Sequence, residues 1–194
     1  VAKIVKEASQ SANVIVVVSA MSGETNRLIK LAKSFGDDPS KREFDALIST
    51  GEKVSAALLA MALHQIDVKA KSYTASQISM KTTNSYSKAR ILEVDGKKIQ
   101  DALDEGIVPI ITGFQGITES GDVTTLGRGG SDTTAVAIAA QMKAERCDIY
   151  TDVDGIYTTD PRVVPEAKKL DTITMEEMLE MASLGAKVMQ PNSI

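Results

Sequence analysis

Apolar positions follow two different periods along the chain, and the two periods alternate. Short Val- and Ile-rich runs are typical of buried strands, whereas apolar residues three or four positions apart are typical of amphipathic helices. The first pattern predicts strands over residues 14–20, 68–73, 91–94, 107–111 and 148–151. The second predicts helices over residues 1–10, 25–35, 42–64 with a break at Gly51, 97–105 and 133–144, while the polar segment 76–89 is expected to form a loop or flap.

Strands that alternate with helices favour an α/β fold with a mostly parallel central sheet and helices on both faces. In such folds, ligands bind beyond the carboxyl ends of the strands. Three turns directly follow predicted strands, at residues 19–25, 113–116 and 151–155, and they can converge on one crevice. Each turn also has a simpler interpretation, which is a helix entry for the first, a tight turn for the second and a primed β-hairpin turn at Asp154-Gly155 for the third.

The segment Thr-Thr-Leu-Gly-Arg-Gly-Gly-Ser-Asp at residues 124–132 carries the strongest chemical signal. Its three glycines leave the backbone open to an anion, and a helix that begins near Ser131 directs unpaired N–H groups and a positive dipole end toward it. Arg128 adds a planar fork that can hold a carboxylate or a phosphate. Asp132 would repel the anion unless a cation lies between them, and this combination suits phosphoryl transfer. The simpler interpretation, an ordinary N-cap at Ser131 or Asp132, leaves Arg-Gly-Gly unexplained.

Composition narrows the classes of function. The 194 residues are 43% hydrophobic and 25% charged, as in an ordinary globular protein, and 22 basic against 26 acidic residues give a net charge of −4. No basic run is interleaved with aromatic residues, which disfavours a nucleic-acid surface and favours small metabolites. With only Cys147 and His64, neither an internal disulfide nor a transition-metal site is expected, and a reducing cytoplasm fits. No signal-peptide pattern and no apolar run near the roughly 18 residues of a membrane span are recognised, so a soluble protein is expected.

A second motif, Thr-Asp-Val-Asp-Gly-Ile-Tyr-Thr-Thr-Asp-Pro-Arg at residues 151–162, accompanies the glycine loop. Together with residues 18–26, 49–52, 113–114 and 185–188, these motifs occur in the order found in aspartokinase catalytic domains of the amino acid kinase family. The matches extend over almost the whole chain, which on this basis resembles that family. The resemblance implies a three-layer α/β sandwich over residues 1–194.

The resemblance implies ATP-dependent phosphorylation of the side-chain carboxylate of L-aspartate to 4-phospho-L-aspartate, the first step toward lysine, threonine and methionine. A carboxylate is a weak nucleophile and the phosphoryl group is shielded by negative oxygens, so such a site supplies positive charge and alignment and needs no nucleophilic side chain. L-Aspartate and ATP are the expected partners, in a cytoplasmic homo-oligomer that binds neither nucleic acid nor membrane.

On the substrate side, the resemblance assigns Arg128 to the carboxylate of aspartate and Glu52 to its ammonium group. Hydroxyl groups complete this pocket, from Ser19, Thr25 and Ser131. The simpler interpretation of Glu52 is a solvated helix face or an ion pair with Lys53 or Arg42. The resemblance favours the substrate role.

On the nucleotide side, the matching family residues contact the base, the ribose and the phosphates, and here they are Thr151, Asp152, Tyr157, Arg162 and Lys187. Asp132 is assigned the catalytic role of organising the cationic groups around the transferred phosphoryl group, together with Mg²⁺ that shares the phosphates. Tyr157 and Arg162 also fit a structural role, in which they pack and pair within a hairpin.

The chain departs from the family pattern in three places. Aspartokinases begin with a strand and a Lys-Phe-Gly-Gly-Thr-Ser turn that touches the transferred phosphate, whereas this chain opens at Val1 on the helix that would follow. The end of the catalytic domain and the ligand-sensing ACT domains are missing, and Asn192 stands where many relatives have an arginine. We therefore expect a domain truncated at both ends. Alone it is expected to be nearly inactive, because loss of one charge-stabilising donor costs roughly 100- to 1000-fold in rate.

Two other functions stay open. A sibling kinase would act on N-acetylglutamate, glutamate or a nucleoside monophosphate, although an acylated amine would have no use for Glu52. A non-catalytic or regulatory subunit would keep the fold without the reaction, although retention of Arg128, Asp132, Glu52 and Lys187 together argues against decay. Phosphoryl transfer across a panel of acceptors tests the first, and titration with ATP and aspartate tests the second.

Overall fold

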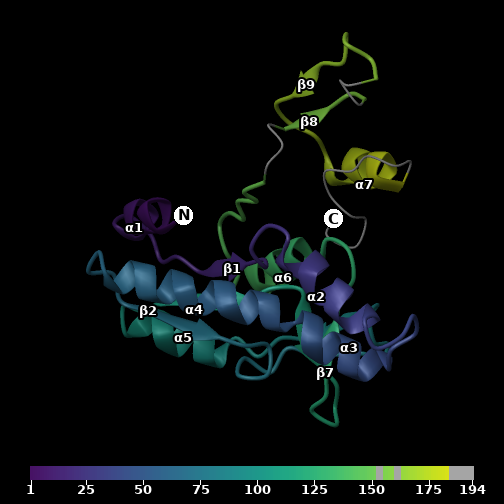
Figure 1. Cartoon of the computed structure of the whole chain (residues 1–194). Coiled ribbons are helices and arrows are strands. Elements are labelled where there is room, and N and C mark those ends of the chain that lie inside the picture. The colour runs from purple at the N-terminus through teal and green to yellow at the C-terminus, as the bar shows by residue number, and fades with distance from the viewer. Residues whose placement is uncertain (152–154, 160–162, 184–194) are drawn as a thin grey trace.

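A three-stranded parallel sheet lies at the centre of the computed structural model, which describes residues 1–151, 155–159 and 163–183 (Figure 1). The strand order is β1 (Val16–Val18), β5 (Val108–Thr112) and β2 (Ala70–Tyr73), and both outer strands run parallel to β5. All residues of β5 are buried. β1 is shorter than predicted, and its valines are half-buried rather than buried, because β1 pairs with a strand on one side only within the described residues.

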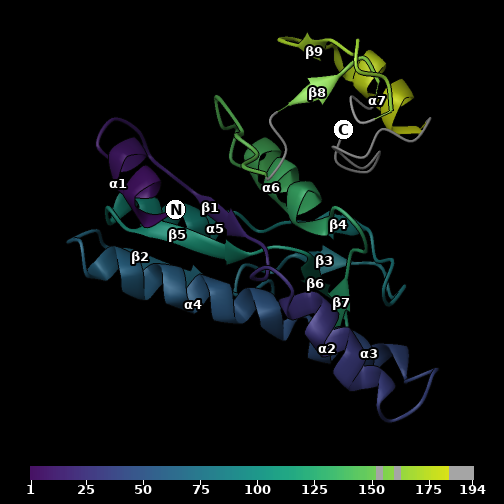
Figure 2. The same cartoon turned by 45° about the horizontal axis from the view of Figure 1, so that its top comes forward.

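One face of this sheet is covered by α1 (Ala2–Ser9) and α4 (Thr50–His64), as Figures 1 and 2 show. Leu63 of α4 and Ile110 of β5 are both fully buried in the apolar cluster on this face. The cluster fixes α4 along the sheet, so the first turn of α4 reaches the carboxyl ends of the strands.

The opposite face is covered by α5 (Lys97–Asp104) and α6 (Gly130–Gln141). Ile99 of α5 and Ile111 of β5 lie in a second apolar cluster. Because successive strand residues point to opposite faces, Ile110 and Ile111 belong to different clusters. Helices on both faces of a parallel sheet confirm the predicted fold class.

A second, four-stranded sheet differs from the prediction. Its strands are, in order, β4 (Ile91–Glu93), β3 (Lys81–Thr82), β6 (Gln115–Ile117) and β7 (Val123–Thr125). The predicted loop at 76–89 contains β3, and the predicted strand at 91–94 pairs antiparallel with β3 instead of joining the parallel sheet. Only residues 83–90 connect the two strands, which is shorter than the dozen or so residues that a parallel crossover needs.

The long predicted helix at 42–64 is divided into α3 (Lys41–Ile48) and α4 by Ser49, not by Gly51. Gly51 lies within α4, where an added Cβ would be 2.8 Å from the Cβ of Ala20. The glycine therefore permits close approach of α4 to the turn after β1. α2 (Glu24–Lys33), which follows that turn, packs against α3.

By length and composition alone, the helical stretch Lys41–His64 is long and apolar enough to cross a membrane. This corrects the expectation that no apolar stretch approaches that length. The stretch contains two buried carboxyl groups, Asp45 and Glu52, and Leu59 and Leu63 on one side of α4 pack against the central sheet. A core helix that covers a sheet meets the same criterion without entering a membrane.

The last part of the chain lies outside the sheet-and-helix body in both views, and it contains β8 (Ile156–Tyr157), β9 (Lys169–Leu170) and α7 (Met175–Ser183) (Figures 1 and 2). The predicted strand at 148–151 is not a strand, because it pairs with no other strand of the described chain. The predicted hairpin turn at Asp154-Gly155 lies partly outside the described residues, since Asp154 is not among them. Gly155 precedes β8, and β8 pairs antiparallel with β9.

Candidate active site

Two of the three predicted turns meet at the carboxyl ends of β1 and β5. The N–H of Gly113, after β5, donates to the carbonyl of Val18 at the end of β1 (3.0 Å). A Cβ on Gly113 would lie 2.8 Å from Oγ and 3.0 Å from Cα of Ser131. Glycine therefore lets the start of α6 reach the edge of the sheet.

The glycine loop enters α6 through left-handed backbone. Gly127 has φ +80° and Gly129, the residue before the helix, has φ +69°. No side chain caps α6, so the simpler interpretation of Ser131 or Asp132 as its N-cap is wrong. Both residues lie in the first turn, at the positive end of the helix dipole, where an anion is stabilised.

Glu52, in the first turn of α4, is the most unusual side chain of this region. It is 3% exposed, and its Oε1 accepts a hydrogen bond from the N–H of Ala20 (3.1 Å), whereas its Oε2 has no partner among the described residues. Burial raises the pKa of Glu52 to about 7, against the opposing effect of hydrogen bonds from its own N–H and that of Ala20. A buried carboxylate with a free oxygen is costly unless a cation approaches it.

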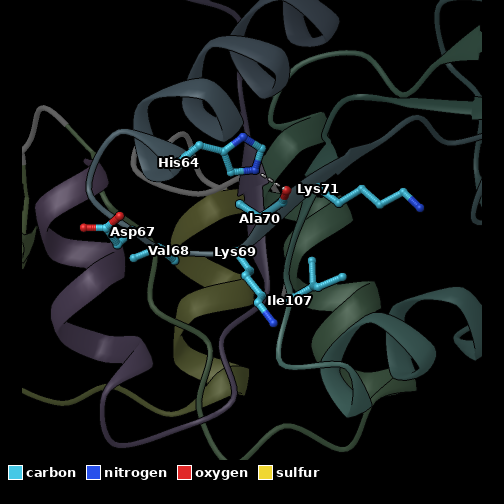
Figure 3. A pocket seen from close by; sticks show the side chains of 7 residues that line it. All are labelled: His64, Asp67, Val68, Lys69, Ala70, Lys71 and Ile107. Atoms are coloured by element: carbon cyan, nitrogen blue, oxygen red, sulfur yellow. Dashed lines mark hydrogen bonds between the residues drawn. The ribbon is translucent and has the colours of Figure 1, made fainter.

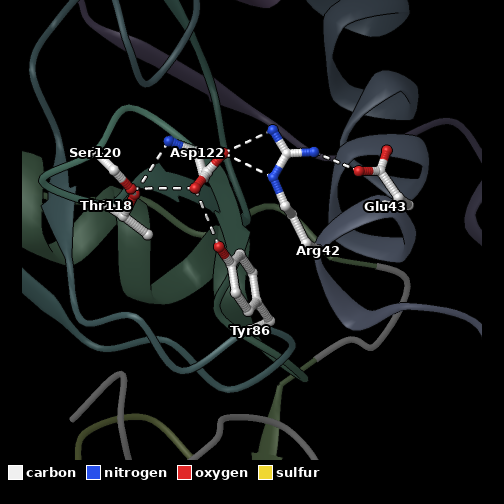
Figure 4. Close-up of polar contacts among 6 residues, drawn as sticks. All are labelled: Arg42, Glu43, Tyr86, Thr118, Ser120 and Asp122. Carbon is white, nitrogen blue, oxygen red and sulfur yellow. Dashed lines mark hydrogen bonds and ion pairs between the residues drawn. The ribbon is translucent and has the colours of Figure 1, made fainter.

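The simpler interpretations of Glu52 are wrong. The side chain is not on a solvated face, and it forms no ion pair with Lys53 or Arg42 in the described chain. Arg42 instead pairs with Glu43 and with Asp122 (2.7 Å), whose other carboxylate oxygen accepts from Tyr86 (Figure 4).

The remaining substrate-side residues surround the same edge. Arg128 is exposed and forms no ion pair within the described ranges, so its guanidinium is open to a ligand. Asp132 is half-buried, and burial raises its pKa. Hydroxyl groups come from Ser131 on α6, from Thr25 on α2 and from Ser19 in the turn after β1. The edge therefore carries a free cation, two desolvated carboxyl groups and several hydroxyls, a set that suits a small ligand with charges of both signs.

Of the five residues predicted for the nucleotide side, the structure describes two. Thr151 is exposed, and Tyr157 is half-buried on β8, away from the carboxyl ends of β1 and β5 in both views (Figures 1 and 2). Asp152, Arg162 and Lys187 lie outside the described residues.

Two buried polar residues near this edge were missed by sequence reasoning. Thr112, the last residue of β5, has a buried hydroxyl without a partner in the described parts of the chain. Asp45 in α3 is fully buried and accepts four hydrogen bonds. Asp45 gave no sequence signal, because four of the eight residues of α3 are charged and a carboxylate there is expected to be exposed. Thr112 gave no sequence signal either, because threonine is common in strands.

A cavity of about 410 Å³ lies elsewhere, next to the amino ends of β2 and β5 (Figure 3). It is lined by His64, Asp67, Val68, Lys69, Ala70, Lys71 and Ile107. His64 Nε2 lies 2.8 Å from the carbonyl oxygen of Ala70. Ligand sites of parallel α/β sheets lie at the carboxyl ends of the strands, so this cavity and His64 are separate from the candidate active site.

The fold thus places a glycine loop at the start of a helix and charged groups at the strand ends. The chain belongs to the amino acid kinase family, whose model matches residues 1–194. It is 58% identical over 192 residues to an aspartate kinase of Pseudomonas putida, covering 99% of this chain and 47% of that protein.

Solved structures agree with this relationship. E. coli aspartokinase III in complex with aspartate and ADP superposes with a TM-score of 0.89 at 32% identity, over 99% of this chain and 54% of that one. Aspartate kinase from Synechocystis gives a TM-score of 0.83 at 48% identity, and the match covers 99% of this chain and 32% of that one. The chain thus spans about half the length, or less, of these relatives.

Proposed function

We propose that this protein uses ATP to phosphorylate the side-chain carboxylate of L-aspartate, giving 4-phospho-L-aspartate, as the first step toward lysine, threonine and methionine. The similarity to aspartokinases supports the reaction class. The observation that carries the choice of substrate is Glu52, whose buried Oε2 lacks a partner within the described residues, among which Arg128 likewise forms no ion pair. An amino acid with a free ammonium group satisfies that oxygen, whereas an N-acylated amino acid does not.

The substrate pocket is formed by residues with complementary charges. Glu52 accepts hydrogen bonds from the ammonium group of aspartate, and Arg128 holds a carboxylate by two parallel hydrogen bonds. Ser19, Thr25 and Ser131 add hydroxyl groups that orient the bound molecule. These contacts fix the reacting oxygen in line with the phosphorus, and the terminal phosphoryl group passes to that oxygen as ADP leaves.

The glycine loop binds the phosphoryl group, and Asp132 organises the cations around it. The uncapped first turn of α6 supplies N–H groups and a positive dipole end. No group of three or more carboxylate, His or Cys ligands occurs in the described residues, but Mg²⁺ bound to phosphates takes only one or two protein carboxylates, so half-buried Asp132 fits this role. When bound, Mg²⁺ neutralises the charge of the transferring group. The nucleotide contacts are proposed for Thr151, Asp152, Tyr157, Arg162 and Lys187.

In the whole protein, residues 1–194 form the catalytic domain, and we propose a cytoplasmic homo-oligomer. The open edge of β1, which pairs only with β5 in the described chain, supports a further neighbour beside the central sheet.

The test is acceptor specificity of the full-length gene product. Purified protein is incubated with ATP and, in parallel, with L-aspartate, L-glutamate, N-acetylglutamate and a nucleoside monophosphate, and acyl phosphate is trapped with hydroxylamine while ADP is measured separately. We expect ADP and hydroxamate in equal amounts with aspartate alone. Turnover with another acceptor would identify a sibling kinase, and binding of ATP and aspartate without turnover would identify a non-catalytic subunit.

A further inference from the structure

A buried carboxylate ties three separate segments together beneath the glycine loop. Asp45 is fully buried in α3, which lies beside β7 in Figures 1 and 2. Its Oδ2 accepts from the N–H groups of Ser87 (2.7 Å) and Thr125 (2.8 Å). Its Oδ1 accepts from the hydroxyl groups of the same two residues, both at 2.9 Å. Four donors to one carboxylate offset the cost of burying it.

Both partners of Asp45 are connected to the base of the glycine loop. Thr125 ends β7, and its carbonyl accepts from Ala89 (3.0 Å). Ser87 has φ +64°, a strained conformation for a residue other than glycine, and its carbonyl oxygen would lie 3.3 Å from a Cβ on Gly127. Asp45 thus holds Ser87 in this conformation next to the first residue of the turn that carries Arg128.

Arg128 depends on this support because its own side chain is not held. It is exposed and lacks an ion pair in the described ranges, so its position is set by the backbone on either side. After Thr125, the N–H of Leu126 donates to the carbonyl of Phe114 (2.9 Å), and Gly130 donates to Gly127 (3.1 Å). The Asp45 contacts fix the opposite side of the same segment.

We propose that Asp45 is a positioning residue that fixes the Thr125–Gly127 backbone and thereby sets the place of Arg128 for aspartate binding. This inference rests on the proposed function in assigning aspartate to Arg128. Asp45 does not touch the substrate. The alternative is that Asp45 serves stability alone, in which case its loss lowers the fraction of folded enzyme and leaves substrate affinities unchanged.

The kinetic test uses the full-length enzyme and three substitutions. Asp45→Asn replaces one carboxylate oxygen with an NH2 group, which cannot accept hydrogen bonds from the donors around it. Thr125→Val removes the hydroxyl donor of Thr125, while the hydrogen bond from its backbone N–H remains. Thr82→Val is the matched control, because Thr82 is 3% exposed and loses its bonds to Thr124 (2.6 Å) and Ile117 (3.2 Å), on the face of β7 opposite to the Asp45 contacts. We expect the KM for aspartate to rise about tenfold in Asp45→Asn and a few-fold in Thr125→Val, corresponding to about 1.4 kcal/mol or less, with the KM for ATP unchanged.

Equal changes in both KM values, a loss of kcat alone, or a rise in the aspartate KM of Thr82→Val as large as that of Thr125→Val would overturn the proposal. If Asp45→Asn does not fold, the comparison between the two threonine variants decides.

A second measurement does not depend on the reaction. Trypsin cleaves after arginine, so the rate of cleavage after Arg128 under native conditions reports how often the glycine loop leaves its native conformation. We expect cleavage there to be several-fold faster in Asp45→Asn and Thr125→Val than in the wild type and in Thr82→Val. Unchanged cleavage in both would refute the positioning role. If the wild type fails to phosphorylate aspartate while the cleavage pattern is as expected, the proposed function fails and the loop-positioning role stands.

Discussion

The proposed aspartate side and the proposed nucleotide side of the candidate site are held in different ways. Glu52 and Ser131 lie on helices that pack on a buried parallel sheet, and glycines at 51 and 113 allow those helices to approach the strand ends. Tyr157, in contrast, lies on a two-residue strand whose ladder is formed with β9 alone, outside the sheet-and-helix body. The first side is fixed by packing, and the second follows residues 148–151, which form no strand ladder within the described chain.

The difference shows that strand propensity and strand formation are separate properties. Residues 149–151 are Ile, Tyr and Thr, which favour strands as the valines at 16–18 do, but within the described chain only residues 16–18 pair in a sheet. A strand needs a partner for its backbone groups, whereas a helix satisfies its own. Substitutions on the proposed aspartate side should therefore change the affinity for aspartate through buried contacts. Substitutions on the proposed nucleotide side should change the affinity for ATP and leave the buried contacts intact.

The largest effect is expected for Glu52→Gln, which keeps the volume and removes the charge. We expect kcat/KM for aspartate to fall roughly 100-fold or more, because loss of one partner of a buried charge pair costs about 2–5 kcal/mol. The KM for ATP should stay the same, as measured by steady-state kinetics with each substrate varied. An equal rise in both KM values would mean that the two sides are not independent.

The pH dependence of stability is the next largest effect. The pKa of Glu52 is raised from 4.5 to about 7, so the folded state holds a proton that the unfolded state releases. Its contribution to the free energy of unfolding is fully present below pH 4.5 and is lost as the pH rises through about 7. The unfolding free energy that is lost between these two pH ranges is on the order of 3 kcal/mol.

Urea unfolding of the wild type and of Glu52→Gln, measured between pH 5 and pH 8, checks this expectation. The wild type should lose stability relative to the variant as the pH rises, and saturating aspartate should abolish the loss because its ammonium group favours the ionised carboxylate. Parallel profiles for the two proteins would exclude a raised pKa at Glu52.

A smaller effect is expected for Gly113→Ala. The new Cβ would meet backbone and side-chain atoms of Ser131 at 2.8–3.0 Å, and overpacking of this kind costs about 1–3 kcal/mol in unfolding free energy. Gly96→Ala is the matched control, since its Cβ would lie 2.8 Å from Sδ of Met142, the end of a flexible side chain that can move. Denaturation curves should separate the two variants, and equal losses would show that α6 can shift away from β5.

The smallest effect is expected on the nucleotide side. Tyr157 is half-buried, and Tyr157→Ala should raise the KM for ATP about fivefold, or about 1 kcal/mol, with little change in the KM for aspartate. Tyr157→Phe, which keeps the ring, serves as the control and should retain most of the affinity. A selective rise in the aspartate KM would place Tyr157 on the other side of the site.

Much of this architecture was predicted from the sequence because it depends on local patterns. The helices, the three strands of the parallel sheet and the helix start after Gly127 and Gly129 follow from periodicity and from backbone freedom. The break at Ser49 and the second sheet could not be predicted, because they depend on which segments pair. Asp45 was missed for the same reason, since its four donors are 42 and 80 residues away in the sequence.

The sequence by itself determined the kind of element at most positions and the residue types at the candidate site. Periodicity and glycine placement follow from steric limits on neighbouring residues, and these act within a few positions. Only the tertiary structure decided that Glu52 is desolvated and that, within the described residues, one of its oxygens lacks a partner, Arg128 forms no ion pair and residues 148–151 join no sheet. Burial and pairing depend on segments that are distant in the chain, so they are settled only when those segments come together.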